Sequence, residues 1–131
     1  NGAFAGLVAI TAEPLTPGPI TAMFIGSVGA IIMYFGTKML ESYGLDDVVG
    51  AIPVHMFAGI FGTLVVPLTN SDTSFGTQFI GTASVCLFSF ILSWATFTAL
   101  KSTIGLRISK AAEKLGTDKA EVGVTAYSIR D

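Results

Sequence analysis

Long apolar runs separated by short polar segments dominate the chain. Three of these runs, at residues 20–40, 48–68 and 79–100, are each about twenty residues long. A helix needs roughly 20 residues to cross a hydrocarbon core about 30 Å thick, so each run predicts one full transmembrane helix. The pattern therefore predicts an all-α membrane protein, a polytopic helical bundle with three complete crossings.

A fourth apolar run, at residues 3–12, is only half as long. A bare half-span would leave unsatisfied backbone groups in lipid, so we expect it to be the end of a helix that begins before Asn1. It also lacks the preceding basic residues and the final Ala-x-Ala pattern of a secretory signal peptide. We therefore expect a fragment, in which this partial helix and the three full helices form a membrane part, 1–101, followed by a tail, 102–131.

The distribution of positive charge predicts the orientation of the helices. One cation is Lys38 and six others lie at Lys101 or beyond it, whereas the connections 13–19 and 69–77 contain neither Lys nor Arg. Because Lys and Arg accumulate on the cytoplasmic side of a membrane, we expect the turn 38–47 and the tail to be cytoplasmic. The sequence thus predicts a multi-pass protein of the cell membrane, with the lipid bilayer as its surroundings.

Composition agrees with a membrane protein and excludes several function classes. The chain is 51% hydrophobic and 12% charged, with a mean hydropathy of +0.71, whereas soluble domains are about 25% charged. A net charge of −2 without a basic face gives no indication of nucleic-acid binding. Cys86 is a lone cysteine, and the sequence holds no Cys/His cluster, phosphate-binding loop or nucleophile beside a base. We therefore expect no enzyme, no catalytic residue, no cofactor and no metal site.

Small residues recur at three- or four-residue spacing in the three full runs. Such faces let helix backbones approach closely in lipid, where packing drives association. Ordinary helix packing accounts for them, so they predict a dense bundle without indicating a function. The residues are Gly26, Gly29, Gly50, Ala58, Gly59, Gly62, Gly81, Ala83 and Ser84.

His55, the only histidine of the chain, is the main candidate functional residue. It lies inside the second full apolar run, and an ionisable residue within a membrane helix is costly and tends to face the bundle interior or a cavity. Apolar surroundings disfavour the imidazolium ion, so we expect a neutral ring with one donor and one acceptor. That ring suits a small neutral solute better than a hydrated ion. The alternative is a structural histidine that hydrogen-bonds across helices.

The neighbours of His55 favour an open space beside it. Ala51 and Gly59 lie one helical turn before and after it, and Pro53 removes a backbone donor and disturbs the helix near Ala51. Small residues on both sides leave volume along the helix face, as a narrow passage requires. The preceding Asp46 and Asp47 either cap the helix N-terminus or attract cations, and capping is the simpler explanation.

Three segments give the chain a resemblance to the ammonium transporter/Rh family. They are NGAFAGLVAITA at 1–12, DDVVGAIPVHMFAGIFGTL at 46–64, and GLRIS followed by LGTDKAEVGVTAY, which ends at Tyr127. The resemblance implies eleven helices, arranged as two inverted five-helix halves and a final helix, in a homotrimer with one pore per subunit. The chain would hold the end of the eighth helix, the ninth to eleventh helices and the cytoplasmic tail, and its partners would include the missing N-terminal helices.

The resemblance also implies a mechanism. Ammonium is recruited at an outer vestibule and loses its proton, and ammonia then passes a hydrophobic pore lined by two histidines. His55 matches the second of these, and Thr11 and Ala51 fall at positions along or near the conduction path. His55, Ala51 and Thr11 are therefore the expected pore and substrate-binding residues.

Two departures from the family pattern concern His55 and the tail. Met56 stands where relatives commonly have Gly after the histidine. The tail reads Glu121-Val122-Gly123-Val124 where the family usually has Glu-His-Gly-Glu. In the family the tail couples subunits, and in many bacterial members a PII-type regulator docks on the cytoplasmic face. The altered tail puts that regulation in doubt.

Two functions therefore remain open. The first is transmembrane transport of ammonium or ammonia through a histidine-lined hydrophobic pore. The second is ammonium sensing, in which the same fold binds the ion and passes a signal to an attached cytoplasmic module. The apolar residues of the tail, from Val122 to Tyr127, would gain no stabilisation from burial if the end of the chain stayed free in water. We therefore expect segment 116–131 to fold back and contact a neighbouring subunit.

Overall fold

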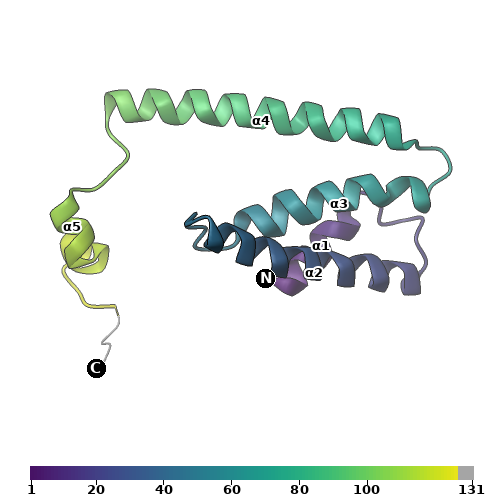
Figure 1. Cartoon of the computed structure of the whole chain (residues 1–131), viewed down its shortest axis with the longest axis horizontal. Coiled ribbons are helices and arrows are strands. Elements are labelled where there is room, and N and C mark those ends of the chain that lie inside the picture. Colours follow the sequence, from purple (N-terminus) through teal and green to yellow (C-terminus); the bar gives the residue numbers. More distant parts are fainter. Residues whose placement is uncertain (127–131) are drawn as a thin grey trace. The chain divides into compact units, whose positions relative to one another are not determined.

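The regular structure of the chain is helical. A computed structural model describes residues 1–126, and within them no strand forms (Figure 1). The elements are α1 (Gly2–Thr11), α2 (Pro19–Ser42), a π-helical segment (Ile52–Phe57) that continues into α3 (Ala58–Val65) and a 3₁₀ turn (Val66–Leu68), α4 (Phe75–Thr103), α5 (Lys110–Leu115) and a final π-helical turn (Asp118–Val122). We call the continuous stretch from the π-helical segment to the 3₁₀ turn the His55 helix.

The chain divides into two compact units, Asn1–Leu87 and Phe88–Asp131. The first holds α1, α2, the His55 helix and the first turns of α4. The second holds the rest of α4, then α5 and the final π-helical turn. Each unit is described by itself below.

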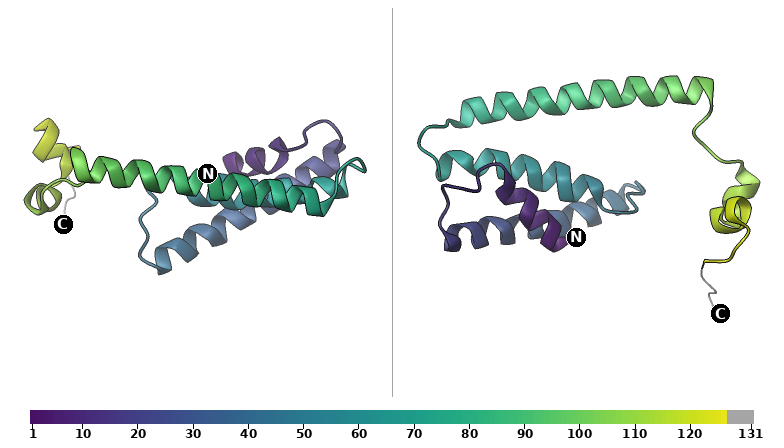
Figure 2. Two further views of the ribbon diagram at one scale, coloured as in Figure 1. Left: turned by 90° about the horizontal axis from the view of Figure 1, so that it is seen from above. Right: turned by 180° about the vertical axis from the view of Figure 1, so that it is seen from behind.

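In the first unit, α1 lies against both α2 and the His55 helix (Figures 1 and 2). Its core consists of Ala5, Val54 and Ala58, with Val8 and Met33 packed against them. A core of such small side chains holds the three helices close together, and in lipid this packing, rather than hydrophobic burial, stabilises helix association.

Glycines mark the points where these backbones approach most closely. A Cβ atom added to Gly29 would lie 2.6 Å from the Cβ of Ala9 and 2.9 Å from the carbonyl oxygen of Ala5. One added to Gly62 would overlap the backbone of Ala9. The predicted close packing is thus confirmed for Gly29 and Gly62, because no larger residue fits there without displacing α1.

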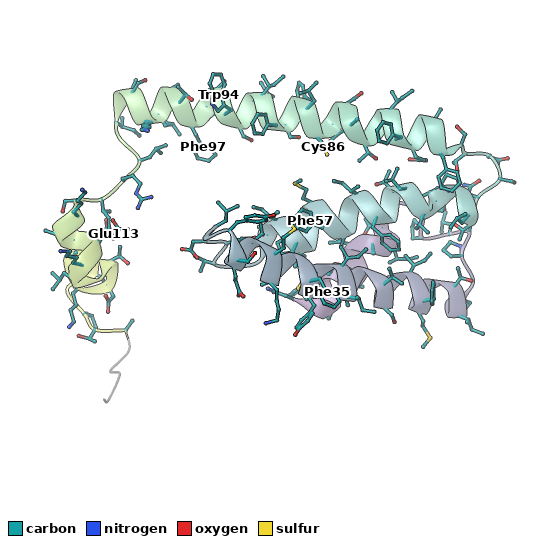
Figure 3. All side chains as sticks on the ribbon, viewed as in Figure 1. Phe35, Phe57, Cys86, Trp94, Phe97 and Glu113 are labelled. Carbon is teal, nitrogen blue, oxygen red and sulfur yellow. The ribbon has the colours of Figure 1, made fainter. Side chains whose placement is uncertain are left out.

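The His55 helix also packs on α2 through an aromatic ring. A Cβ on Gly36 of α2 would lie 2.5 Å from the ring of Phe57, which Figure 3 labels, and 3.1 Å from the Cβ of Pro53. Pro53 is fully buried at this contact. Gly36 therefore leaves the room that the proline and the ring occupy, and this fixes the start of the His55 helix against α2.

Among the described residues two helices, α2 and α4, are long and apolar enough to cross a membrane. The run predicted to span 48–68 is shorter than expected, because residues 43–50 form turns and the apolar helix covers Ile52–Leu68. That length is at the lower end of the range for a single crossing. The run predicted at 3–12 forms α1.

The second unit contains a folded segment after α4. Ser109 caps α5, since its hydroxyl accepts a hydrogen bond from the amide of Ala112 at 3.2 Å. Arg107 pairs with Glu113 at 3.0 Å, and the amide of Ala126 donates to the carboxylate of Asp118 at 2.9 Å. The predicted contact of Tyr127, and the cation Arg130, lie outside the described residues.

Candidate functional site

A turn with a left-handed glycine opens the His55 helix. Gly50 has a φ of +73°, a conformation that residues with a Cβ rarely adopt. The carboxylate of Asp47 then accepts hydrogen bonds from the amides of Ala51 at 2.9 Å and Ile52 at 2.8 Å. Of the two roles considered for the acids, capping is confirmed for Asp47.

Pro53 leaves a carbonyl in this turn to be satisfied from elsewhere. In a regular helix the amide of residue 53 would bond to the carbonyl of Val49, but proline has no N–H. The side-chain amide of Asn1 donates to that carbonyl at 3.0 Å instead. The first residue of the chain thus ties the start of α1 to the start of the His55 helix.

His55 lies within the π-helical turn that follows. The turn covers Ile52–Phe57, and such i→i+5 turns are rare, occur where the regular ladder is interrupted, and are frequent at functional sites. Here Pro53 interrupts the ladder. The extra residue of a π turn changes where the following side chains point, so Pro53 influences the direction of the His55 ring.

A hollow of about 460 Å³ lies between α1 and the start of the His55 helix, and we call it the His55 hollow. One wall is a single face of α1, on which Phe4, Leu7 and Val8 follow one another at helical spacing. The other wall comes from the turn and the His55 helix. Its remaining lining residues are Asn1, Val49, Gly50, Ala51, Val54 and His55.

The chemistry of the hollow is apolar with one imidazole. The Asn1 amide is already engaged with Val49, so His55 is the remaining lining residue with a polar side chain. A neutral imidazole offers one donor and one acceptor, while aliphatic and aromatic walls cannot replace the water shell of an ion. The arrangement suits a small, uncharged, hydrogen-bonding solute.

The structure places two of the three predicted site residues in the hollow. Ala51 and His55 lie one turn apart in its wall. Thr11 does not line it, and its hydroxyl donates to the carbonyl of Leu7 at 2.6 Å. Since Thr11 is one turn beyond Leu7 on the same face of α1, it continues that wall past the hollow.

Sequence reasoning missed the residues of α1 that line the hollow. The spacing of Phe4, Leu7 and Val8 marks one helix face, but an apolar face on a membrane helix can equally meet lipid. The packing of Ala5 on Val54 and Ala58, and of Ala9 on Gly62, shows which face of α1 meets the His55 helix.

His55 also borders a second hollow of the first unit. This hollow, of about 310 Å³, is lined on one side by His55, Gly59 and Thr63 and on the other by the first turns of α4, including Gln78 and Thr82. The hydroxyl of Thr82 is buried and has no hydrogen-bond partner among the described residues. Met56, the departure from the family pattern, lines this second hollow and not the His55 hollow.

An acidic hollow lies beside the start of the His55 helix. It has a volume of about 260 Å³, and Glu41, Asp46 and Asp47 line it together with Thr37, Gly50 and three apolar residues, Leu40, Leu45 and Val48. Because Asp47 is committed to the helix cap, Asp46 and Glu41 are the acids that remain for solvent or cations.

At the other end of the helices, Glu13 joins the connection after α1 to the connection after the His55 helix. Its carboxylate accepts a hydrogen bond from the side-chain amide of Asn70 at 2.8 Å and another from the amide of Leu15 at 3.3 Å. The hydrogen bond from Asn70, followed by that from Leu15, lowers the pKa of Glu13 below its ordinary value. The two connections are therefore held together by a charged group.

Comparison with known proteins identifies relatives along nearly the whole chain. The model of the Ammonium Transporter Family matches residues 1–127. The chain is 37% identical to the ammonium transporter Amt2 of Archaeoglobus fulgidus, with 97% of the chain and 31% of that protein covered. For Amt1 of Methanocaldococcus jannaschii the identity is 34%, with 98% and 35% covered.

A eukaryotic relative gives the same result. Ammonium transporter 1 of Schizosaccharomyces pombe is 30% identical, with 100% of the chain and 31% of that protein covered. The chain spans about a quarter to a third of the length of the curated relatives that it matches first, at 31%, 24% and 30%. The relatives from Archaeoglobus fulgidus, Methanocaldococcus jannaschii and Schizosaccharomyces pombe are all named as transporters, not as enzymes.

Proposed function

The chain belongs to the ammonium transporter family, and from this premise we propose that it forms part of a passage through which ammonia crosses the membrane. The protein is a membrane protein of a transporter family and not of an enzyme family. The observation that carries the proposal is the His55 hollow, which combines apolar walls from two helices with a single imidazole.

Each site residue has a role in this proposal. His55 donates or accepts one hydrogen bond with the passing ammonia, while Ala51 and Phe4 set the width of the passage. Thr11 lies further along the same face of α1 as Leu7, where the passage continues. Ammonium is the proposed substrate. It releases its proton to water at the mouth, so that neutral ammonia enters, because the apolar walls do not stabilise a cation.

The proposal extends to the whole assembly. We propose that the chain supplies the end of the eighth helix and the ninth to eleventh helices of an eleven-helix, inverted-repeat fold, and that three copies form a homotrimer. Relatives three to four times as long as the chain support this. Helices supplied by the rest of such a protein would close the open side of the hollow, as in other transporters with sites near the bilayer midplane.

The orientation of the proposed fold follows the positive charges. The tail, 102–131, and the turn with Lys38 are placed in the cytoplasm, so the acidic hollow with Asp46 lies at the inner mouth. The connection with Glu13 and Asn70 then lies at the outer surface, in a multi-pass arrangement.

The experiment that tests the proposal compares His55→Ala with Met56→Ala in the intact protein. Uptake of radiolabelled methylammonium should be abolished or altered in selectivity for His55→Ala, with assembly intact. Met56→Ala, which changes the second hollow but not the lining of the His55 hollow, should keep uptake within about twofold, because the width of the proposed passage stays the same. A His55→Ala protein with normal rate and selectivity would show that the histidine is only structural.

Ammonium sensing remains the second candidate, and the folded tail favours it. Three contacts order the segment after α4, from the Ser109 cap to the Asp118–Ala126 hydrogen bond, which a free end would not require. We propose that this segment touches a neighbouring subunit and relays the state of the pore to an attached signalling domain or a PII-type regulator. Deleting 116–131 separates the alternatives, because a sensor loses its ammonium-dependent output while a transporter keeps its uptake.

A further inference from the structure

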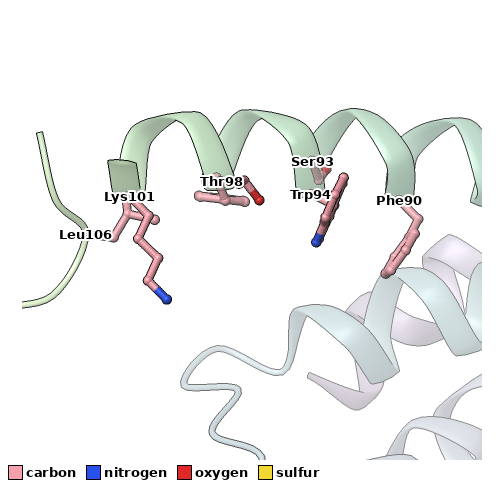
Figure 4. Close-up of a pocket in the computed structure, with 7 residues that line it drawn as sticks. Phe90, Ser93, Trp94, Thr98, Lys101 and Leu106 are labelled. Atoms are coloured by element: carbon pink, nitrogen blue, oxygen red, sulfur yellow. The ribbon is translucent and has the colours of Figure 1, made fainter. Parts of the chain in front are cut away.

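The second half of α4 carries a groove that the proposed passage does not use. It has a volume of about 380 Å³ and lies wholly within the second unit. Phe90, Trp94, Phe97 and Lys101 follow one another at spacings of four, three and four residues, so they share one face of the helix. Figure 4 shows Phe90, Trp94 and Lys101 extending from the same side of α4.

The side chains of this groove change in character along its length. Phe90 is 70% exposed and Trp94 is 64% exposed. The end of the groove at Phe90 therefore has a large aromatic surface. Lys101 and the hydroxyl of Thr98 lie at the other end, where Leu106, beyond the helix, completes the lining. The groove therefore has an apolar length and one polar, positively charged end.

The dimensions of the groove match one leaflet of a bilayer. Phe90 and Lys101 are separated by eleven residues, or about 16 Å along the helix axis, and half of a hydrocarbon core is about 15 Å. Since α4 has 29 residues and a length of about 43 Å, its last turn reaches the headgroup region. Lys101 then lies at the level of lipid headgroups and Phe90 near the middle of the bilayer.

Charge decides which lipid fits. The first acid after Lys101 in the sequence, Glu113, is paired with Arg107 at 3.0 Å. Within residues 1–126 Lys101 forms no ion pair. Basic groups between the end of a membrane helix and the headgroups attract anionic lipids. A zwitterionic headgroup brings its own cation and gains less from Lys101.

We propose that this groove binds one anionic phospholipid, with its phosphate on Lys101 and Thr98 and an acyl chain along Phe97, Trp94 and Phe90. The inference rests on α4 crossing the bilayer and not on ammonium transport, so it holds for a transporter and for a sensor. The lipid belongs to the leaflet at the Lys101 end of α4.

The test uses the intact protein and lipids whose acyl chains carry bromine, which quenches tryptophan fluorescence on contact. The probes are brominated phosphatidylglycerol and brominated phosphatidylcholine, titrated into detergent-solubilised protein. The signal of Trp94 is the difference between the native protein and Trp94→Phe. We expect phosphatidylglycerol to quench this signal at a concentration about fivefold lower than phosphatidylcholine does. The attraction between one lysine and an anionic headgroup corresponds to a preference of about this size.

Lys101→Gln and Lys110→Gln form the matched pair, since Lys110 lies on α5 and does not line the groove. Lys101→Gln should remove the preference for phosphatidylglycerol, and Lys110→Gln should keep it. Native mass spectrometry of retained phosphatidylglycerol gives a second readout that does not depend on Trp94→Phe. Absence of quenching by either lipid would show that protein, from the same or a second copy, covers the groove. Absence of quenching would overturn the proposal. Equal quenching by both lipids would also overturn it, as would equal effects of the two lysine variants.

Discussion

At the scale of single residues, Asp47 is the side chain on which the start of the His55 helix most depends. Its carboxylate accepts hydrogen bonds from the amides of Ala51 and Ile52, whereas the side chain of Asp46 forms no such cap. Asp47→Ala should therefore lower the free energy of unfolding of the intact protein by about 0.5–2 kcal/mol, measured by denaturant titration in micelles. Asp46→Ala is the control and should change it by less than about 0.5 kcal/mol. Equal losses in the two variants would contradict the assignment of the cap.

The same residues show what sequence can predict at this scale. Capping by an acid before a helix is local, so the sequence offered it as the simpler of two roles for Asp46 and Asp47. The sequence also predicted the disturbance that Pro53 causes. It did not predict the Asn1 contact that satisfies the carbonyl of Val49, because a hydrogen bond between distant positions depends on how helices pack.

At the scale of helices, the close approach of α1 and α2 makes a sharp prediction. Gly29→Ala would bring a methyl group to 2.6 Å from the Cβ of Ala9, which forces the helices apart and should cost about 1–3 kcal/mol of unfolding free energy. The control is Gly81→Ala on α4, where an added Cβ meets nothing within 4 Å. It should be neutral or stabilise by up to about 1 kcal/mol. Unfolding in a denaturing detergent measures both, and a Gly81→Ala loss as large as that of Gly29→Ala would refute the packing.

The connection held by Glu13 predicts a dependence on acid. Because Asn70 and Leu15 hold the pKa of Glu13 below its ordinary value of 4.5, its stabilisation is complete above that value and is lost as the pH falls through the lower folded-state pKa. Thermal stability should thus be flat from pH 6 to 8 as far as Glu13 contributes, and fall in acid.

Asn70→Ala removes the largest cause of this shift. The variant should be less stable than the native protein at pH 7, and the difference should shrink as the pH falls through the lowered pKa of Glu13. Thermal unfolding between pH 3 and pH 7 measures this, with Asp72→Asn in the same connection as control. Parallel curves for Asn70→Ala and the native protein would exclude the role of Glu13.

Helix positions were largely readable from the apolar runs, and their ends were not. The run at 20–40 corresponds to α2 and that at 79–100 to α4, because each is predominantly apolar over a membrane thickness. The run at 48–68 included Val48 and Val49, which are apolar but lie in the turn before Gly50. Hydropathy does not register a left-handed glycine or a capping carboxylate, and both fix where that helix begins.

At the scale of the whole molecule, the His55 hollow is open on one side. The chain spans only about a quarter to a third of the length of its relatives. The sequence itself indicated that His55 faces a passage and that the small Ala51 leaves room beside it, and the resemblance then assigned both residues to the pore. The facing wall of Phe4, Leu7 and Val8 required the structure, since periodicity gives a helix face but not its partner. The proposed passage is complete only when other helices cover the open side.

The central claim is that ammonia passes through the His55 hollow, and blocking the hollow tests it most directly. Ala51→Phe places a ring in the hollow, whereas Ile52→Phe places the same ring on the next residue, which does not line it. Methylammonium uptake by the intact protein should fall by about tenfold or more for Ala51→Phe, because pore width limits permeation, and should change little for Ile52→Phe. Native uptake by a correctly assembled Ala51→Phe protein would contradict the claim.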